Sequence, residues 1–374
     1  MLSSVFAKNT QKNTDGRITN VICNSAKQGL IPQREYFDKN IANSDNTNGY
    51  YIIEENDFVY NPRKSADAPY GPISSYKYTE AGIVSPLYLC FRAKKEINPA
   101  FFEWYFRSSA WHRYVYMSGD SGARHDRVSI KDDTFFAMPI NIPSAHEQAQ
   151  IAIFLERIEQ RIEMQRALVD SLKKYKRGVV AAIFSHQLKF SDATGNPYPE
   201  WTSCTLQDAV DFLDGQRKPL ESADRAKRQG QYPYYGASGI IDYIDDFIFD
   251  EPLLLLGEDG ANILNRSTPL CFIAEGKYWV NNHAHVMRPK AGQNIKFLCE
   301  LLESLDYTRY NTGTAQPKLN QDKCRRIALA LPVYEEQCHI ADFLSAFDQR
   351  TDKAQSILDY LLSNRDGLLQ QLFI

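Results

Sequence analysis

The stretch Ile142-Pro-Ser-Ala-His-Glu-Gln-Ala-Gln-Ile-Ala-Ile-Phe-Leu155 recurs later in the chain as Leu331-Pro-Val-Tyr-Glu-Glu-Gln-Cys-His-Ile-Ala-Asp-Phe-Leu344. The two copies stand at a constant offset of 189 positions, the difference between Pro143 and Pro332. The same offset aligns Gln160-Arg161 with Gln349-Arg350, and Phe184 with Phe373, without a gap. Register kept over about forty residues indicates an internal duplication, because chance repeats are short. The sequence therefore predicts two copies of one structural plan.

Composition bounds the class of protein. The 374 residues are long enough for two or three domains, and 43% hydrophobic content allows each its own core. No apolar run approaches the roughly 20 residues of a membrane span, and no signal sequence opens the chain, so we expect a cytoplasmic protein without a membrane partner. The seven cysteines form no Cys-x-x-Cys pair, which disfavours a zinc knuckle or a redox motif. A net charge of -3 is unusual for a nucleic-acid binder, although a balanced total can hide a basic face.

The pattern predicts four segments: a mixed region 1–143, a long helix and linker 144–190, a second mixed region 191–330, and a C-terminal long helix 331–374. In the mixed regions, short aromatic or aliphatic runs bounded by polar turns predict strands. These runs are Tyr50–Ile53, Asp57–Tyr60, Ile83–Phe91, Phe247–Phe249, Leu253–Leu256 and His283–Met287. Helical spacing predicts a helix near Pro99–Tyr114 and its counterpart near Ile295–Leu305. The fold class is therefore α+β.

Both copies of the repeat predict a helix of roughly 38 residues, about 57 Å long. Ser144 and Glu147 have the spacing of a capping box, whereas the second copy has Val333 in place of the serine. Apolar residues recur every seven positions, as in a coiled-coil seam. The predicted helix-pair seam comprises Ile151, Leu155, Ile158, Ile162 and Leu172 in the first copy and Ile340, Leu344, Phe347, Leu358 and Leu361 in the second. We expect the two helices to pack against each other, because each alone would leave its apolar stripe in water.

The chain resembles the specificity (S) subunit of type I restriction-modification systems. The resemblance rests on Gly313-Thr-Ala-Gln-Pro-Lys-Leu-Asn320, on the Pro-x-x-x-Glu-Gln-x-x-Ile-Ala-x-Phe-Leu entries into both helices, on Asp348-Gln-Arg350, and on Tyr198-Pro-Glu-Trp201 followed by Leu206 and Asp208. It implies two α/β target recognition domains separated by two long antiparallel coiled-coil helices, related by an internal pseudo-twofold repeat. Each domain would read one half of a bipartite DNA target, and the helices would set the spacer.

The resemblance also implies partners. These are double-stranded DNA, two modification (methyltransferase) subunits and the restriction (motor/nuclease) subunits. S-adenosylmethionine, ATP and Mg²⁺ are expected on the partner subunits, and no cofactor or metal on this chain. In agreement, the nearest fragments to a methyltransferase catalytic loop, Asn61-Pro-Arg and Asn196-Pro-Tyr, lack a second proline, and no glycine-rich nucleotide loop occurs. The expected role is a non-catalytic one.

One departure from the family pattern concerns the start of the chain. The second half opens with Pro199-Glu-Trp201, and the first half has no counterpart. The first recognition domain is therefore expected to be shortened at its start, and a missing edge strand would leave a sheet unpaired.

Arginine, lysine and amide side chains in loops are the candidates for contact with bases and phosphates. In the first mixed region these are Arg63, Lys64, Arg124, His125 and Arg127, and in the second they are Gln216, Arg217, Lys218, Tyr235, Asn262, Asn281, Asn282, Gln316 and Lys318. Each has the competing interpretation of an ordinary solvated loop residue. Loops at matched positions of both copies favour Arg124–Arg127 and Gln316–Lys318.

Two alternatives to DNA recognition stay open. Asp259, Glu275 and Lys277 resemble the two carboxylates and the lysine of a metal-dependent nuclease, although surface charges flanking a strand explain them as well. His283 and His285 supply two imidazoles on one strand face but no third ligand, so polar contacts or packing explain them better than a metal. The other alternative is an assembly scaffold that binds only protein subunits and reads no DNA.

Overall fold

The computed structural model describes residues 1–36, 47–119, 126–313 and 316–373. The chain forms two compact units. Unit 1 contains Met1–Arg166 and Ser356–Ile374, and unit 2 contains Ala167–Gln355. Each unit is therefore built from one mixed region and stretches of both repeated segments. In the part of the chain that is described, no helix has the length and apolar character to cross a membrane.

The two repeated segments are long unbroken helices, α5 (Ala145–Phe184) and α11 (Tyr334–Leu372). The predicted capping box is present at the start of α5, where the Ser144 amide donates to Glu147 Oε2 at 3.0 Å and the Glu147 amide donates to Ser144 Oγ at 3.3 Å. Each helix also has a glutamine side chain folded back on the preceding proline carbonyl, from Gln148 to Pro143 and from Gln337 to Pro332. The Gln of the Glu-Gln motif therefore serves as a helix-start cap.

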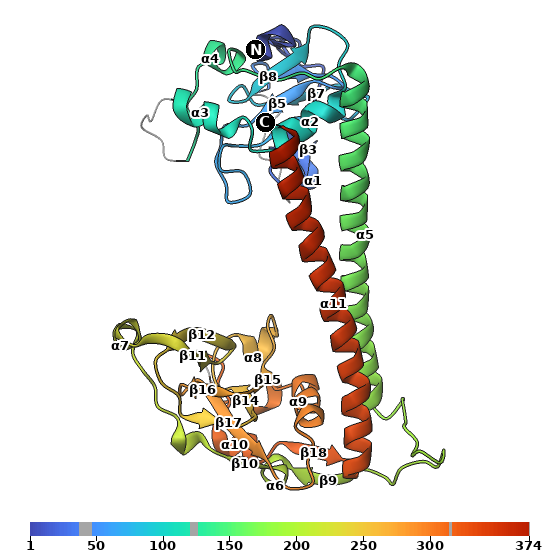
Figure 1. Ribbon diagram of the computed structural model, residues 1–374, viewed down its shortest axis with the longest axis vertical. Coiled ribbons are helices and arrows are strands. Elements are labelled where there is room, and N and C mark those ends of the chain that lie inside the picture. The colour runs from blue at the N-terminus through green and yellow to red at the C-terminus, as the bar shows by residue number, and fades with distance from the viewer. Residues whose placement is uncertain (37–46, 120–125, 314–315, 374) are drawn as a thin grey trace. The chain divides into compact units, whose positions relative to one another are not determined.

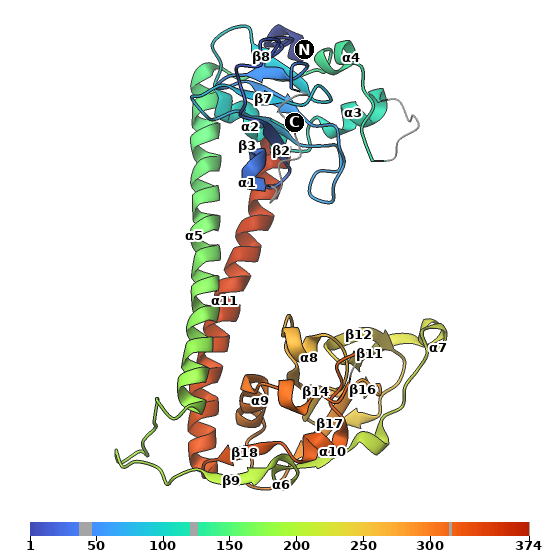
Figure 2. The same cartoon turned by 180° about the vertical axis from the view of Figure 1, so that it is seen from behind.

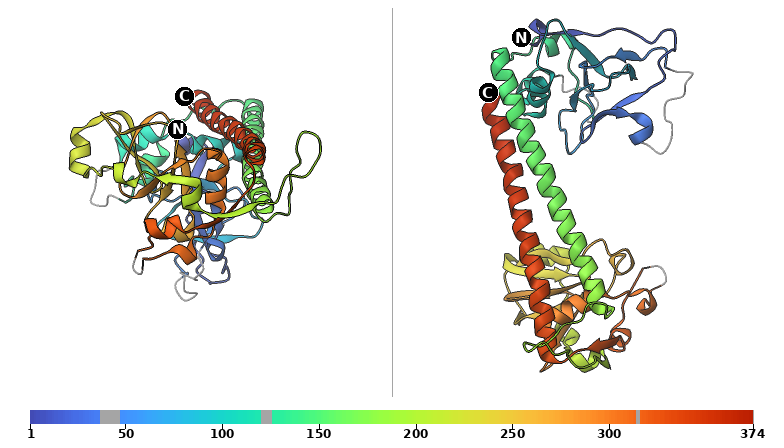
Figure 3. Two further views of the ribbon diagram at one scale, coloured as in Figure 1. Left: turned by 90° about the horizontal axis from the view of Figure 1, so that it is seen from below. Right: turned by 90° about the vertical axis from the view of Figure 1, so that its right-hand side faces the viewer.

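Within each unit, stretches of α5 and α11 lie side by side (Figure 3). In unit 1 Arg365 contacts Glu159 at 3.4 Å, and in unit 2 Lys176 contacts Asp348 at 2.7 Å. Residue numbers rise along one helix as they fall along the other, so the two run antiparallel. Of the seam positions, Leu155, Ile162, Ile340 and Leu344 are fully buried, Leu172 and Leu358 are nearly so, and Ile151, Ile158, Phe347 and Leu361 are half-buried.

The main sheet of the two units has one topology. In unit 1 the order is β1-β8-β5-β6, formed by β1 (Phe6–Lys8), β5 (Phe58–Tyr60), β6 (Ile73–Ser75) and β8 (Leu89–Ala93). In unit 2 the order is β10-β17-β14-β15, formed by β10 (Val210–Phe212), β14 (Leu253–Gly257), β15 (Cys271–Ala274) and β17 (Ala284–Pro289). All neighbouring strands in these two sheets are antiparallel. The pairing register is also the same in both sheets, since Tyr60 pairs with Leu89 in unit 1 where Leu256 pairs with His285 in unit 2.

A second layer of strands also recurs. Unit 2 has the order β12-β11-β16-β13, from β11 (Gln229–Gly236), β12 (Gly239–Ile244), β13 (Phe249–Asp250) and β16 (Lys277–Val280). Unit 1 has two separate antiparallel pairs instead, β2 (Ile22–Ser25) with β3 (Gly29–Pro32), and β4 (Tyr51–Ile53) with β7 (Gly82–Val84). A single parallel bridge between Val21 and Ile83 joins these pairs, where unit 2 has the parallel pairing of β11 with β16. Figures 1 and 2 show both units from opposite sides.

Short helices complete the plan. The matched pairs are α2 (Pro99–Arg107) with α9 (Ile295–Ser304), and α4 (Asp132–Phe136) with α10 (Gln321–Arg325). Asn98 and Asn294 cap the first pair with their side chains. The remaining helices are α1 (Gln33–Tyr36), α3 (His112–Ser118), α6 (Leu206–Ala209), α7 (Ser222–Lys227) and α8 (Asn262–Asn265).

Three local expectations differ from the structure. The strand expected over Ile83–Phe91 is divided between β7 and β8 by a turn at residues 86–87. The helix expected over Pro99–Tyr114 is broken into α2 and α3, because the Ser108 backbone turns to an extended conformation and the Trp111 indole donates back to the Phe106 carbonyl. The strand expected at Phe247–Phe249 is confined to β13, and Phe247 lies outside it, under the ammonium of Lys277.

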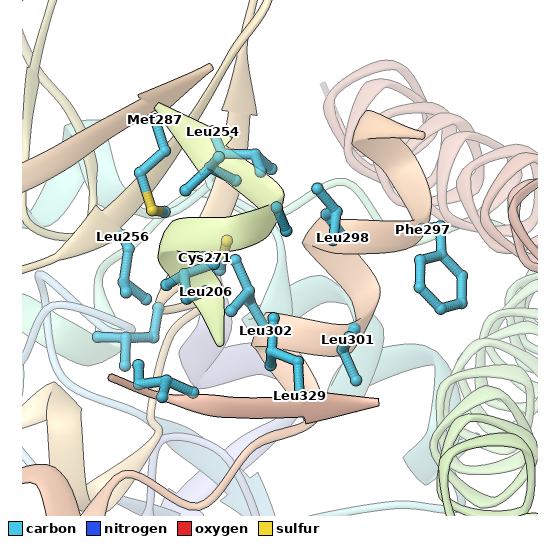
Figure 4. Close-up of a cluster of buried hydrophobic side chains, with 14 of the residues drawn as sticks. Leu206, Leu254, Leu256, Cys271, Met287, Phe297, Leu298, Leu301, Leu302 and Leu329 are labelled. Carbon is cyan, nitrogen blue, oxygen red and sulfur yellow. The ribbon is translucent and has the colours of Figure 1, made fainter. Parts of the chain in front are cut away.

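The cores of the units differ in chemistry. Unit 1 is filled by aromatic rings, among them Phe6, Phe58, Phe91, Phe102 and Trp111, which meet mostly edge to face. Unit 2 is filled mainly by leucines of β14, α9 and neighbouring segments, around Met287 and Cys271 (Figure 4). One plan is therefore maintained by two different packings.

The openings of the two mixed regions also differ. In unit 2, β9 (Thr202–Thr205) pairs antiparallel with β18 (Ala328–Leu331), next to the start of α11. In unit 1 the residues before α5, from 139 to 142, are not assigned to a strand. The amide of Leu2 donates instead to the carbonyl of Met138 at 2.7 Å.

Candidate nucleic-acid interface

In both units the segment that follows the central strand meets the segment that precedes the last short helix. In unit 1 an isolated bridge joins Arg63, just after β5, to Arg127, just before α4. In unit 2 the equivalent bridge joins Asp259, just after β14, to Lys318, just before α10. We call these contacts junction 1 and junction 2. Each collects candidate DNA-contacting residues from two distant parts of the chain.

Backbone hydrogen bonds fix both junctions in the same way. In junction 1 the Lys64 amide donates to Asp126 and the Val128 amide to Pro62, each at 2.9 Å. In junction 2 the Gly260 amide donates to Pro317 at 3.0 Å and the Leu319 amide to Glu258 at 2.7 Å. The two junctions share this frame of backbone hydrogen bonds, so the differences between them lie in their side chains.

Junction 1 presents cations with little internal compensation. Arg63 and Lys64 are exposed, and among the described residues the carboxylate that contacts Arg127 is that of Asp126, at 3.9 Å. The Nε of Arg127 is buried without a hydrogen-bond partner. Arg124 and His125 lie outside the described residues. Junction 1 therefore has positive charge available for an anionic ligand.

A cavity of about 290 Å³ adjoins junction 1. It is lined by residues of β1, β5, β8 and α4 and of the segments between them, including Lys8, Tyr60, Pro62, Leu89, Val128 and Asp132. Lys8 and Asp132 form an ion pair of 2.6 Å at its edge. The ring of Tyr60 stacks on Phe135 of α4, so aromatic contact anchors this helix.

Junction 2 is compensated internally. Glu258 contacts Arg217 at 2.8 Å and Lys318 at 3.3 Å, and Arg217 also approaches Asp214 at 3.5 Å. The guanidinium of Arg217 is only 14% exposed and donates further to the carbonyl of Ala284 at 2.7 Å. Arg217 is therefore occupied by the protein itself, whereas half of the Lys318 side chain remains in solvent.

His285 lies at the centre of this network and is fully buried. Its Nδ1 is 2.7 Å from Asp214 Oδ2, and its Nε2 is 2.8 Å from the carbonyl oxygen of Leu319. A carbonyl only accepts, so Nε2 carries a proton, and the carboxylate favours a second proton on Nδ1. Burial is the largest single influence and lowers the pKa of His285, but the hydrogen bonds and charges of Asp214 and Cys324 together outweigh burial and raise the pKa to about 10.

Asp214 is held in its charged form. Burial would raise its pKa, yet the hydrogen bond from His285, the charge of His285 and the Val286 amide together hold the pKa below its ordinary value. Its carboxylate also accepts from the Gln321 side chain at 2.7 Å. Asp214 thus links β17 to the first residue of α10.

Asp214, Glu258 and His285 also stand within ligand distance of one another, so we tested whether they suit a cation. Both ring nitrogens of His285 already have acceptors, and Glu258 already faces Arg217 and Lys318. A metal requires a free, deprotonated nitrogen. The donor set therefore fits an internal ion-pair network and not a metal centre.

The other candidates of unit 2 are dispersed. Gln216, Lys218, Asn282 and Gln316 are exposed, the first three on segments beside Arg217 and β17. Tyr235 stacks on Phe272, and the Asn262 side chain bonds both backbone groups of Thr268. Asn281 is buried, and its Oδ1 accepts from the His283 amide at 2.8 Å. These last three have local structural contacts.

The nuclease-like residues are not brought together. Asp259 follows the last residue of β14 and contacts His283 at 2.8 Å, whereas Glu275 follows Ala274, which pairs with the first residue of β14. Asp259 and Glu275 therefore lie at opposite ends of β14, and at about 3.3 Å per residue the length of that strand keeps them apart. Lys277 is 4.0 Å from Asp250.

Sequence patterns indicate the loops of both junctions but not the network beneath junction 2. Asp214 and Glu258 stand in no motif, and for His285 the sequence predicts polar contacts or packing without naming a partner. The signal that could have indicated this network is a histidine at an inward-facing position of an otherwise apolar strand. A histidine buried there needs a hydrogen-bond partner that is buried as well.

Comparison with known proteins gives a consistent result. A family model, the type I restriction modification DNA specificity domain, matches residues 5–174 and 198–361. A protein named "putative type I restriction enzyme specificity subunit" from Haemophilus influenzae is 32% identical over 155 residues, 41% of this chain and 38% of that protein. The type I restriction enzyme EcoprrI specificity subunit of Escherichia coli is 28% identical over 154 residues, 41% of this chain and 37% of that protein. The match thus spans less than two fifths of each relative.

Solved structures share the fold. The S subunit of a type I restriction-modification system from M. genitalium superposes with a TM-score of 0.58 at 16% identity, covering 100% of this chain and 95% of that one. A chain of a type I R-M system complex gives a TM-score of 0.62 at 13% identity, covering 99% and 95%. The expectation of an α+β fold with two duplicated domains is confirmed.

Proposed function

The chain belongs to the family of type I restriction modification DNA specificity domains, and from this premise we propose that it is the DNA-recognition subunit of a type I restriction-modification complex. Each unit would read one half of a bipartite target in double-stranded DNA. The observation that carries the proposal is that one frame occurs twice with different side chains at its two junctions. A shared frame with different contacts is what two distinct half-sites require.

The long helices would set the spacer between the half-sites. Both α5 and α11 contribute residues to unit 1 and to unit 2, so we infer that the length of these two helices sets the spacer. In dimeric DNA-binding proteins half-site spacing follows from protein geometry.

The chain itself would be non-catalytic. We infer that two methyltransferase subunits and the restriction subunits dock on it and supply S-adenosylmethionine, ATP and Mg²⁺ chemistry. The dispersal of Asp259, Glu275 and Lys277 supports this division of labour.

Mapping methylated adenines in DNA modified by the chain together with its methyltransferase partners tests the proposal. We expect a single asymmetric bipartite motif. Arg63→Ala with Arg127→Ala should weaken reading of one half only, while the other half keeps its preference. Modification without any sequence preference would favour an assembly scaffold instead.

The spacer is tested by deleting one heptad from each helix at matched positions, 164–170 and 353–359. Seven residues of helix correspond to about 10 Å, or roughly three base pairs. We expect a spacer shortened by that amount with both half-sites unchanged. An unchanged spacer would contradict the role of the helices.

A further inference from the structure

A buried imidazole lies directly under the segment that leads into α10. We define the pre-α10 loop as Asn311–Gly313 and Gln316–Asn320. His285 Nε2 donates to the carbonyl of Leu319, whose own side chain is fully buried. The neighbouring residue Lys318 is exposed, as is Gln316. The imidazole therefore anchors the buried end of a loop that exposes the side chains of Gln316 and Lys318.

Asp214 supplies a second anchor on the other side of Asn320. Its Oδ2 accepts from His285 Nδ1 and from Gln321 Nε2, each at 2.7 Å, and its Oδ1 accepts from the Val286 amide at 2.9 Å. The His285–Asp214 pair thus holds the chain immediately before and immediately after Asn320. The end of the loop is fixed from both sides by one pair of residues.

The rest of the pre-α10 loop depends on that end. Asn311 Oδ1 accepts from the Lys318 amide at 2.8 Å, and the Thr312 amide donates to the Lys318 carbonyl at 2.8 Å. A Cβ on Gly313 would stand 1.7 Å from the Gln316 carbonyl, so the loop is closed too tightly for a side chain there. A displacement at Leu319 would therefore shift Lys318 and the contacts that Asn311 makes.

We propose that His285 and Asp214 are positioning residues that hold the pre-α10 loop, and with it the side chains of Gln316 and Lys318, in the geometry that reads one half-site. The inference rests on the proposed function. Neither residue contacts DNA, because both are enclosed in unit 2.

This positioning device belongs to unit 2. The residue at the register position of His285 in unit 1 is Leu89, which pairs with Tyr60 as His285 pairs with Leu256. Leu89 lines the cavity beside junction 1. Loss of the His285–Asp214 pair should therefore affect one half-site only, which separates positioning from a general loss of folding.

The experiment uses His285→Leu, which installs the residue of unit 1, and His285→Gln, which keeps a neutral hydrogen-bonding group. Val286→Ala is the matched control, because its side chain leaves the opposite face of the same strand and packs away from the pre-α10 loop. Each full-length chain is assembled with its methyltransferase partners. Binding is measured on duplexes with the mapped target and with either half scrambled.

We expect His285→Leu to lose roughly tenfold in discrimination at one half-site and His285→Gln to lose less, since a buried group without its partner costs more than a weakened bond. Discrimination at the other half-site should stay within about twofold, and Val286→Ala should leave both unchanged at temperatures where unit 2 is folded. Hydrogen exchange at the amides of Lys318 and Leu319 should accelerate in His285→Leu while the amides of β14 stay protected.

Three outcomes would overturn the inference: equal losses at both half-sites, the same loss in Val286→Ala, or unchanged discrimination and exchange in both His285 variants. Failure of the proposed function is distinguishable, because the unaltered chain would then show no preference for either half of any duplex. The exchange measurement needs no DNA and tests the anchoring in either case.

Discussion

Junction 1 and junction 2 occupy the same place in the same fold, yet different forces hold them. In junction 1, Tyr60 stacks on Phe135, Arg63 is exposed and Arg127 is half-buried, with the Asp126 carboxylate 3.9 Å away. In junction 2, Glu258 and Asp214 engage Arg217, Lys318 and His285. The difference shows that a duplicated frame preserves backbone hydrogen bonds while the side chains beneath it are replaced as a set.

The largest expected effect concerns the anchors of α4 and α10. Phe135 and Cys324 stand at the constant offset of 189 and are both fully buried. Phe135→Ala should cost about 3–5 kcal/mol and Cys324→Ala about 1 kcal/mol, because the ring leaves a much larger cavity than a thiol. Amide hydrogen exchange, followed separately in unit 1 and unit 2, measures the loss of stability in each variant. Equal costs would show that aromatic anchoring does not distinguish the units.

The next effect is a pH dependence confined to unit 2. The folded-state pKa of His285 is raised to about 10 from an ordinary value of 6.5. The stabilisation is therefore fully present below about pH 6.5 and is lost as pH rises towards 10. The titratable groups that face the imidazole are Asp214, Glu258 and Cys324. Arg217 also faces this site, because it contacts the carboxylates of Asp214 and Glu258.

We expect the free energy of unfolding of unit 2 to fall by at least about 1.4 kcal/mol, the equivalent of one pKa unit, between pH 6.5 and 10. Denaturant titrations at several pH values, monitored by exchange in each unit, would measure it. His285→Leu should remove this slope. A slope that persists in the variant would have to come from other groups.

A smaller effect separates the exposed cations. Arg127→Ala should weaken DNA binding about tenfold and reduce the salt dependence by about one counterion. Lys318→Ala should have a lesser effect, because Glu258 already neutralises part of its charge. Titrations at several salt concentrations compare the two variants. Equal salt slopes would indicate that Glu258 releases Lys318 on binding.

The smallest effect lies in the helix pair. Lys176→Met removes contacts of 2.6 and 2.7 Å to Glu300 and Asp348, whereas Arg365→Met removes one interhelical contact of 3.4 Å to Glu159 and a contact of 2.8 Å to the more exposed neighbour Asp366. We expect about 1 kcal/mol for the first and a few tenths for the second, as for partly exposed ion pairs. Thermal unfolding of both variants shows which one loses more stability. A larger loss in Arg365→Met than in Lys176→Met would contradict the expected order.

The sequence predicts best where the two copies share one offset. The two long helices and their starts follow from the difference of 189, and heptad positions such as Leu155 and Leu344 are buried. Elsewhere loop lengths differ, and Tyr60 and Leu256, equivalent in register, stand 196 apart. The sheet correspondence is therefore hidden from a gapless comparison.

The junction side chains show the same limit. Arg63 and Arg127 are loop residues that a search for cations finds, but their bridge depends on a backbone pairing across 64 positions. Arg217 is predicted from the sequence as a DNA-contacting residue, but in the structure it contacts the carboxylates of Asp214 and Glu258. Only the fold determines which cations remain available.

The helix contacts have a consequence for inheritance. Glu159 and Asp348 are equivalent in the repeat, as are Lys176 and Arg365, so the two interhelical ion pairs are one contact made twice with the helices exchanged. A genetic crossover at Pro143 between two genes that share this repeat would replace the segment before α5 and keep both ion pairs and both glutamine caps. New combinations of recognition units could then arise by recombination in a single step, with the scaffold inherited unchanged.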